Sequence, residues 1–157
     1  MVNKITYDSN MCANSVADTA VDVAALLQAP AGSAVIAVLE RLDPMALSEP
    51  DRLVLLEVWD KQTCWINAQT LTATVAFAGT KPVDSDDFVR EDVRAALRLS
   101  RHSAHERIDA ARLLSSTLTQ SHHALAEGQL SSGQVRRLYE ELHALPAHVA
   151  VAAETRS

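Results

Sequence analysis

The segment Arg90–Tyr139 carries the residues whose types and spacing best fit a defined chemistry, which is DNA recognition. Arginine and histidine side chains recur here at helical spacing on both sides of a short polar turn. An arginine fork can donate two hydrogen bonds to guanine, and a helix with such residues in its first turns can enter the major groove. The sequence therefore predicts a helix-turn-helix, with one helix ending near Leu99 and the next starting after Ser100.

The apolar residues of this segment predict which side chains of the two helices face outward. Val93, Ala96 and Leu97 form the expected inward face of the first helix. The second helix has an apolar stripe of its own, made of Ala104, Ile108, Ala111 and Leu114. Groove contacts are expected from the residues near its start: Arg101, His102, Ser103, His105 and Arg107. Phosphate contacts are expected from five arginines: Arg94, Arg98, Arg112, Arg136 and Arg137. An ordinary helical hairpin with arginines for solubility would show the same pattern.

Charge is distributed unevenly along the chain. The 157 residues carry a net charge of −6, which argues against indiscriminate binding of nucleic acid. Residues 1–80 hold nine acidic residues against four lysines and arginines, whereas residues 93–139 hold seven arginines against three acidic residues. A basic patch on an acidic protein is compatible with local contact to double-stranded DNA, although a set of solvated helix faces would also produce it.

Other classes of site find little support in the sequence. Cys12 and Cys64 lack zinc-finger spacing, and the adjacent His122 and His123 would point about 100° apart on a helix, so no metal or cofactor is expected. The absence of a nucleophile–base pair or a phosphate-binding loop predicts that the protein is not an enzyme. No signal peptide pattern or apolar run of about 18 residues occurs, so a cytoplasmic protein that does not insert into membranes is expected.

Helical periodicity predicts an all-α fold, with a long central helix and a C-terminal bundle resembling a helix-turn-helix. Ser48, Pro50 and the break at Gly79–Pro82 delimit the long helix, about 49–78. The polar connector after residue 81 predicts two regions, 1–81 and 82–157. The other helices are expected over 16–28 with Ser15 as its cap, 33–42, 88–98, 102–115, 117–126, 132–144 and 147–154.

The long helix suggests an alternative function, protein–protein interaction. Trp59 and Trp65 lie six residues apart and so on different faces, where core packing is the expected use and an interface the alternative. The helix is about 45 Å long at 1.5 Å per residue and could pair with its copy in a second chain. The chain would then act as a helical dimer, or as an inhibitor or adaptor that binds a host protein.

Two resemblances bear on the C-terminal region and on most of the chain. The run L-A-E-G-Q-L-S-S-G-Q-V-R-R-L after the arginine-rich segment resembles the region that follows the helix-turn-helix of ParB-type partition proteins. The matching residues are Leu125, Glu127, Gly128, Leu130, Ser131, Gly133 and Arg136, while Gln134 stands where that family usually has histidine.

The second resemblance covers roughly residues 35–155. The motif L-x-R-L-D-P-x-x-L-S-E-P-D-R-L-x-L-L, the alanine-rich helix and the A-L-A-E-G-Q-L-S-S-G-Q-V run occur in the order seen in an uncharacterised actinobacterial helical domain. That domain precedes HNH endonuclease domains in a repeat family linked to mobile elements. The 157 residues contain no Cys- and His-rich HNH module. The resemblance thus implies a DNA-binding, regulatory module of phage or mobile-element type without nuclease activity of its own.

Overall fold

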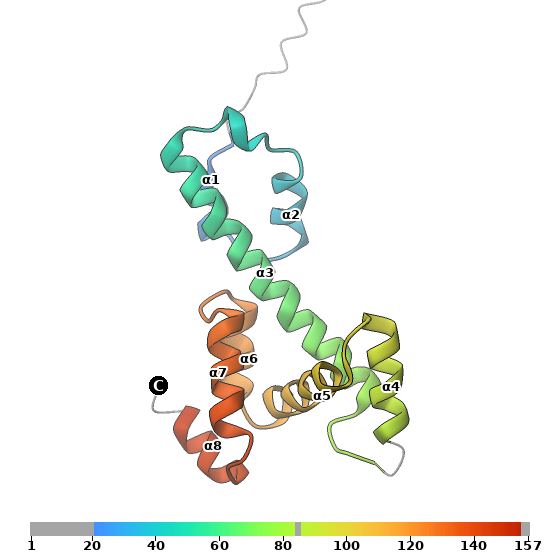
Figure 1. Ribbon diagram of the computed structural model, residues 1–157. Coiled ribbons are helices and arrows are strands. Elements are labelled where there is room, and N and C mark those ends of the chain that lie inside the picture. The colour runs from blue at the N-terminus through green and yellow to red at the C-terminus, as the bar shows by residue number, and fades with distance from the viewer. Residues whose placement is uncertain (1–20, 84–85, 155–157) are drawn as a thin grey trace, which may run out of the picture.

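A computed structural model describes residues 21–83 and 86–154 of the chain. These residues form helices and connecting turns without any strand, which confirms the predicted all-helical class (Figure 1). The α-helices are α1 (Val23–Gln28), α2 (Ser33–Leu39), α3 (Glu49–Ala78), α4 (Asp86–Leu97), α5 (Arg101–Ser116), α6 (Thr119–Ala126), α7 (Ser132–Leu142) and α8 (Ala147–Glu154), and η1 (Pro44–Ala46) is a short 3-10 turn.

The helix predicted over 16–28 begins at Val23 in the described residues. Asp22 is its N-cap, because its carboxylate accepts hydrogen bonds from the backbone N–H groups of Ala24 and Ala25 at 3.0 and 3.1 Å. The predicted cap Ser15 and residues 16–20 lie outside the described residues. Apolar residues continue at helical spacing on both sides of Asp22 in the sequence. Their periodicity therefore does not indicate that α1 begins at Val23.

Local capping explains where α3 begins and ends. The Ser48 hydroxyl accepts a hydrogen bond from the backbone N–H of Asp51 at 3.3 Å. Pro50 lies in the first turn, where a backbone N–H has no carbonyl partner within the helix, so a residue without an N–H costs no hydrogen bond there. At the other end Gly79 adopts φ +73°, a left-handed conformation that glycine enters without a Cβ clash. The helix between these signals spans 30 residues and runs from the part of the fold that holds α1 and α2 to the part that holds α4 and α5 (Figure 1).

α3 buries opposite faces along its two halves. Leu55 and Val58 in its first half pack with Val23, Val35 and Leu39 of α1 and α2. Its second half places Cys64 and Ala68 against the buried residues of the later helices, Leu114, Leu118, Leu125, Val135, Leu142 and Ala150. The α3 terminus adds Ala78 to a third cluster with Val93, Ala104 and Ile108. One helix therefore joins all three clusters, and the predicted division after residue 81 stays a prediction.

Lys61, near the middle of α3, contacts both the end of α1 and the turn between α6 and α7. Its ammonium group donates hydrogen bonds of 2.9 Å to the carbonyls of Leu27 and Ala29, which end α1. Its aliphatic stem lies against Gly128, whose φ is +73°. A Cβ at Gly128 would stand 2.5 Å from the Lys61 Cγ, so this position requires glycine for both conformation and space.

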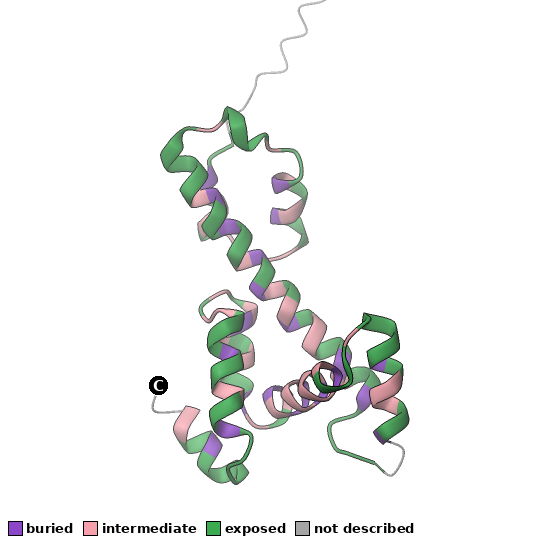
Figure 2. Ribbon diagram, in the orientation of Figure 1, coloured by how far each residue is buried: buried purple, intermediate pink, exposed green. Residues whose placement is uncertain are grey.

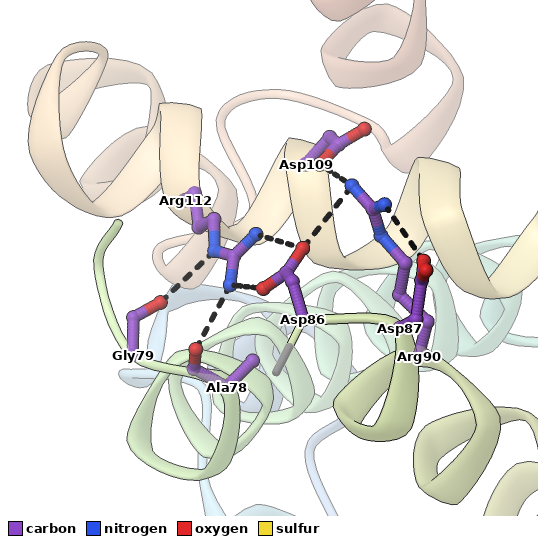
Figure 3. A network of polar contacts seen from close by, with 7 residues as sticks. All are labelled: Ala78, Gly79, Asp86, Asp87, Arg90, Asp109 and Arg112. Atoms are coloured by element: carbon purple, nitrogen blue, oxygen red, sulfur yellow. Dashed lines mark hydrogen bonds and ion pairs between the residues drawn. The ribbon is translucent and has the colours of Figure 1, made fainter. Parts of the chain in front are cut away.

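A buried ion pair fixes the junction of α3, α4 and α5 (Figure 3). Arg112 of α5 and Asp86 at the start of α4 are each 6% exposed. The Arg112 guanidinium donates to both Asp86 carboxylate oxygens, at 2.5 and 3.1 Å, and to the carbonyls of Ala78 and Gly79, at 2.9 and 3.1 Å. These bonds pair the buried charges of Arg112 and Asp86 with each other. They also give hydrogen-bond donors to two carbonyls at the end of α3 that have no partner within the helix.

Arg90 extends this network toward the surface. Its guanidinium lies 3.2 Å from an Asp86 carboxylate oxygen, 3.7 Å from Asp87 and 3.9 Å from Asp109 (Figure 3). Hydrogen bonds from Arg112 hold the pKa of Asp86 below its usual range, against the opposing effect of burial and with further help from the charges of Arg112 and Arg90. Asp86 is therefore ionised in the folded protein at neutral pH.

None of the helices in the described part of the chain combines the length and apolar character needed to cross a membrane.

Replacing Arg112 with methionine should lower the free energy of unfolding by about 3–5 kcal/mol, because the Asp86 carboxylate would stay buried without its main partner. Denaturant unfolding followed by circular dichroism measures this loss. The double variant Arg112→Met/Asp86→Leu should recover part of it, whereas Arg136→Ala, which breaks an exposed pair with Glu140, should change stability by no more than about 0.5 kcal/mol. Equal losses in Arg112→Met and Arg136→Ala would contradict the assigned role of the buried pair.

The free energy of unfolding should also depend on pH, because Asp86 is protonated at low pH. Since the folded-state pKa of Asp86 is lowered, its contribution is complete above the unfolded-state value of about 4 and is lost as pH falls through the lower folded-state value. Unfolding free energies measured from neutral pH downward should therefore decline below about pH 4. The Asp86→Asn variant should start lower and decline less steeply, and parallel curves for the two proteins would argue against this linkage.

Candidate nucleic-acid interface

The connection between α4 and α5 has the length found in helix-turn-helix units. Three residues, Arg98 to Ser100, join the helices, and Arg98 adopts φ 54° in the left-handed region. The Leu99 backbone N–H bonds to the Arg94 carbonyl at 3.0 Å, which closes the end of α4. The Ser100 hydroxyl then accepts from the Ser103 backbone N–H at 3.0 Å and so starts α5.

The inward face expected for α4 is only partly present. Val93 is buried against Ala104 and Ile108, with Val89 and Leu99 packed beside them. The prediction that Ala96 and Leu97 face inward is wrong, because Ala96 is exposed and Leu97 is 44% exposed. The chain reverses at Arg98, directly after Leu97, and leaves the last turn of α4 on the surface.

The structure gathers four of the predicted site residues at this connection, with one acid among them. We call this group the turn cluster: Arg94, Arg98, Arg101, His102 and Glu91. All of its basic members are exposed. Glu91 lies between two of them and accepts hydrogen bonds from Arg94 at 2.7 Å and Arg101 at 3.2 Å.

These contacts set the electrostatics of the turn cluster. The hydrogen bonds from Arg94 and Arg101 lower the pKa of Glu91, so it is ionised at neutral pH. Three arginines against one carboxylate leave an excess of positive charge at the N-terminal end of α5, where unpaired backbone N–H groups also favour anions. Within the described residues, no hydrogen bond or ion pair engages the Arg98 guanidinium.

Sequence reasoning did not identify Glu91 as part of this site. Its spacing three residues before Arg94 is a signal for a pair on one helix face. Its contact with Arg101 crosses from α4 to α5 and depends on how the two helices pack, which no local pattern shows.

Ser103 and Arg107 belong to a different surface, a groove between α3, α5 and α7. This groove has a volume of about 290 Å³, and Arg136 and Tyr139 of α7 and Asn67 of α3 also line it. Arg107 is half-buried there, six residues after Arg101 and so about 120° away around α5. The residues predicted to enter the DNA groove together therefore face two directions.

The other predicted site residues are not gathered at the turn. His105 is half-buried on α5. Arg136 is exposed on α7 and pairs with Glu140 at 2.9 Å. Arg137 lines a separate groove bordered by α6 and Glu154 of α8.

Arg112 is the clear correction to the predicted site. It was expected to face outward and contact phosphate, but it is 6% exposed and its guanidinium is bonded to Asp86, Ala78 and Gly79. Moving it to a phosphate would leave the Asp86 carboxylate buried without its partner. Arg112 therefore supports the position of the turn cluster and is not available to a ligand.

The outward side of α5 beyond its first turn is mixed in charge. Glu106 follows His102 by one helical turn and lies 3.3 Å from its ring nitrogen. Asp109 comes next along the same side and its side chain is 43% exposed. These carboxylates would repel a phosphate group, so on this side of the molecule the excess of positive charge is confined to the turn cluster.

Comparison with known proteins gives one match. No match to this chain was found among curated proteins or among solved structures. The profile of a family described as a domain of unknown function, DUF222, matches residues 64–157, which is more than half of the chain and includes the second half of α3 and all of α4 to α8. The chain belongs to the DUF222 family.

Proposed function

We propose that the protein binds double-stranded DNA through the turn cluster. The observation that carries this proposal is the gathering of three exposed arginines around the connection of α4 and α5, with Glu91 as their one carboxylate partner and His102 beside them, paired with Glu106. Exposed ion pairs contribute only about 0–1 kcal/mol, so Arg94 and Arg101 can exchange Glu91 for a phosphate at little cost. Arg98 needs no such exchange.

Binding of this kind relies mainly on the phosphate backbone. The first turn of α5 presents Arg101 and His102 to the groove, while Glu106 and Asp109 limit how far the helix can follow the bases. Affinity should therefore depend strongly on salt and only weakly on sequence. The helix-turn-helix arrangement of α4 and α5 is part of this proposal.

The resemblances to ParB-type proteins and to the helical domain that precedes HNH endonucleases support the same role. We infer a cytoplasmic, regulatory DNA-binding module of phage or mobile-element type that has no nuclease activity of its own. A role in protein association is the second candidate, and the exposed apolar residues along α3 favour it.

The double variant Arg98→Ala/Arg101→Ala should weaken binding to a short labelled duplex by at least about tenfold, since two phosphate contacts are lost. Fluorescence anisotropy over a series of salt concentrations measures both affinity and its salt slope. That slope should become less steep by about two units, at about 0.9 per phosphate. Circular dichroism should show unchanged helicity, because both side chains are exposed.

Arg136→Ala/Arg137→Ala is the matched control, because it removes the same charge from α7. It should leave affinity within about threefold of the wild type. An equal loss in the two double variants would show attraction by net charge alone and would overturn the assignment to the turn cluster. Unchanged affinity in Arg98→Ala/Arg101→Ala would overturn the proposal as well.

A further inference from the structure

One face of α3 carries a stripe of small and apolar side chains between Leu56 and Phe77, and its member Thr70 also borders the groove between α3, α5 and α7. Its members, called here the α3 stripe, are Leu56, Trp59, Thr63, Ile66, Thr70, Ala73 and Phe77. They follow one another at alternating intervals of three and four residues, which is the spacing of a helix-pairing seam. All are exposed except Thr70, which is half-buried. Figure 2 shows exposed residues interspersed with buried ones along α3.

The large members of the stripe are markedly accessible. Leu56 is 66% exposed, Trp59 38%, Ile66 45% and Phe77 60%. With roughly 200 Å² for each such side chain, they present about 400 Å² of apolar surface, which is as large as the largest apolar patch of a typical monomer. Core packing is the use that the sequence predicts for Trp59, but its side chain is exposed on this face of α3.

The polar members of the stripe are already satisfied within α3. The Thr63 hydroxyl donates to the Trp59 carbonyl at 2.9 Å, and the Thr70 hydroxyl donates to the Ile66 carbonyl at 2.8 Å. Their methyl groups are therefore the parts left to meet a partner. Burying this stripe would leave no threonine donor without an acceptor, so it carries little desolvation penalty.

We propose that the α3 stripe is the interface of a homodimer, in which α3 pairs with α3 of a second copy in antiparallel orientation. The seam from Leu56 to Phe77 is about 32 Å long at 1.5 Å per residue. With the threonine methyl groups, Ala73 and the stems of flanking side chains, such a pair approaches the roughly 800 Å² per partner that stable complexes bury.

Charge along α3 selects the antiparallel orientation. Every charged residue of the helix lies in its first half: Glu49, Asp51, Arg52, Glu57, Asp60 and Lys61. A parallel pair would set these groups against their own copies, and Arg52, which continues the line of the stripe, would face Arg52 of the partner subunit. An antiparallel pair sets the charged half against the uncharged half and places Arg52 near the carbonyl end of the opposite helix, where a cation is favoured.

Side-chain size agrees with this orientation. Ile66 lies near the midpoint of the stripe, the bulky Leu56 and Trp59 precede it, and the small Thr70 and Ala73 follow it. Antiparallel pairing brings the bulky segment of each helix against the opposite segment that contains Ala73. Trp59 then faces the small Ala73 of the opposite helix, while Leu56 faces Phe77 and Ile66 faces its own copy, so the largest side chain of the stripe meets the smallest one.

In sedimentation equilibrium at micromolar concentration, the full chain should show the mass of a dimer, twice the 17.0 kDa of one chain. Ile66→Glu places a carboxylate at the centre of the seam in both copies and should raise the dimer dissociation constant at least about 100-fold. Gln69→Glu is the matched control, because it adds the same charge at an exposed position of α3 outside the stripe and should preserve the dimer. Circular dichroism should show both variants folded, since neither side chain is buried.

Oxidative crosslinking tests the orientation in a Cys12→Ser background. Ile66→Cys should form a disulfide-linked dimer, whereas Phe77→Cys should not, because its two copies would lie about 30 Å apart and a disulfide needs Cα atoms within about 7 Å. Efficient crosslinking of Phe77→Cys would overturn the antiparallel arrangement. A monomeric wild type, or loss of the dimer in Gln69→Glu as well as in Ile66→Glu, would overturn the interface itself. DNA affinity of the turn-cluster variants is measured separately, so either proposal can fail without the other.

Discussion

The pairing of Arg112 with Asp86 constrains the whole C-terminal part of the molecule. Two charges buried at 6% exposure are tolerated only if their donors and acceptors are satisfied together, and here this requires α4, α5 and the end of α3 to meet at one point. The position of α4 on α5 follows largely from that requirement, since a small apolar cluster around Val93 and Ile108 and two more exposed ion pairs, Arg90 with Asp109 and Arg101 with Glu91, make the other contacts between the two helices. The geometry of the turn cluster therefore depends on an interaction that is itself out of reach of any ligand.

Much of this fold could be predicted because its signals are local. Ser48, Ser100 and Ser131 act as N-caps where a short polar residue precedes an amphipathic run, and Gly79 and Gly128 take positive φ where helices end. Gln134 completes a capping box with Ser131, so its side chain has a structural use at the start of α7. Helix positions and most helix ends follow from such pairs of neighbouring residues.

What could not be predicted depends on partners distant in sequence. Nothing in the neighbourhood of Arg112 distinguishes it from Arg107, yet one is buried and the other lines a groove, because Asp86 lies 26 residues earlier and folds against only one of them. The exposed end of α4 has the same origin, since it reflects the sharp reversal at Arg98 and not the apolar content of Ala96 and Leu97. Arginines can be counted from a sequence, but their accessibility is decided by tertiary packing.

The opposed burial along α3 has a geometric consequence for the molecule. Helices α1 and α2 attach to one side of the first half, and the later helices attach to another side of the second half, with Lys61 near the crossing point. A single residue inserted into α3 at this crossing would rotate α1 and α2 by about 100° around the helix axis, and shift them by about 1.5 Å along it, relative to the later helices. Each half would keep its own apolar cluster, but Lys61 could no longer contact both the end of α1 and Gly128, so the insertion would remove the link that sets the orientation of α1 and α2 relative to the later helices.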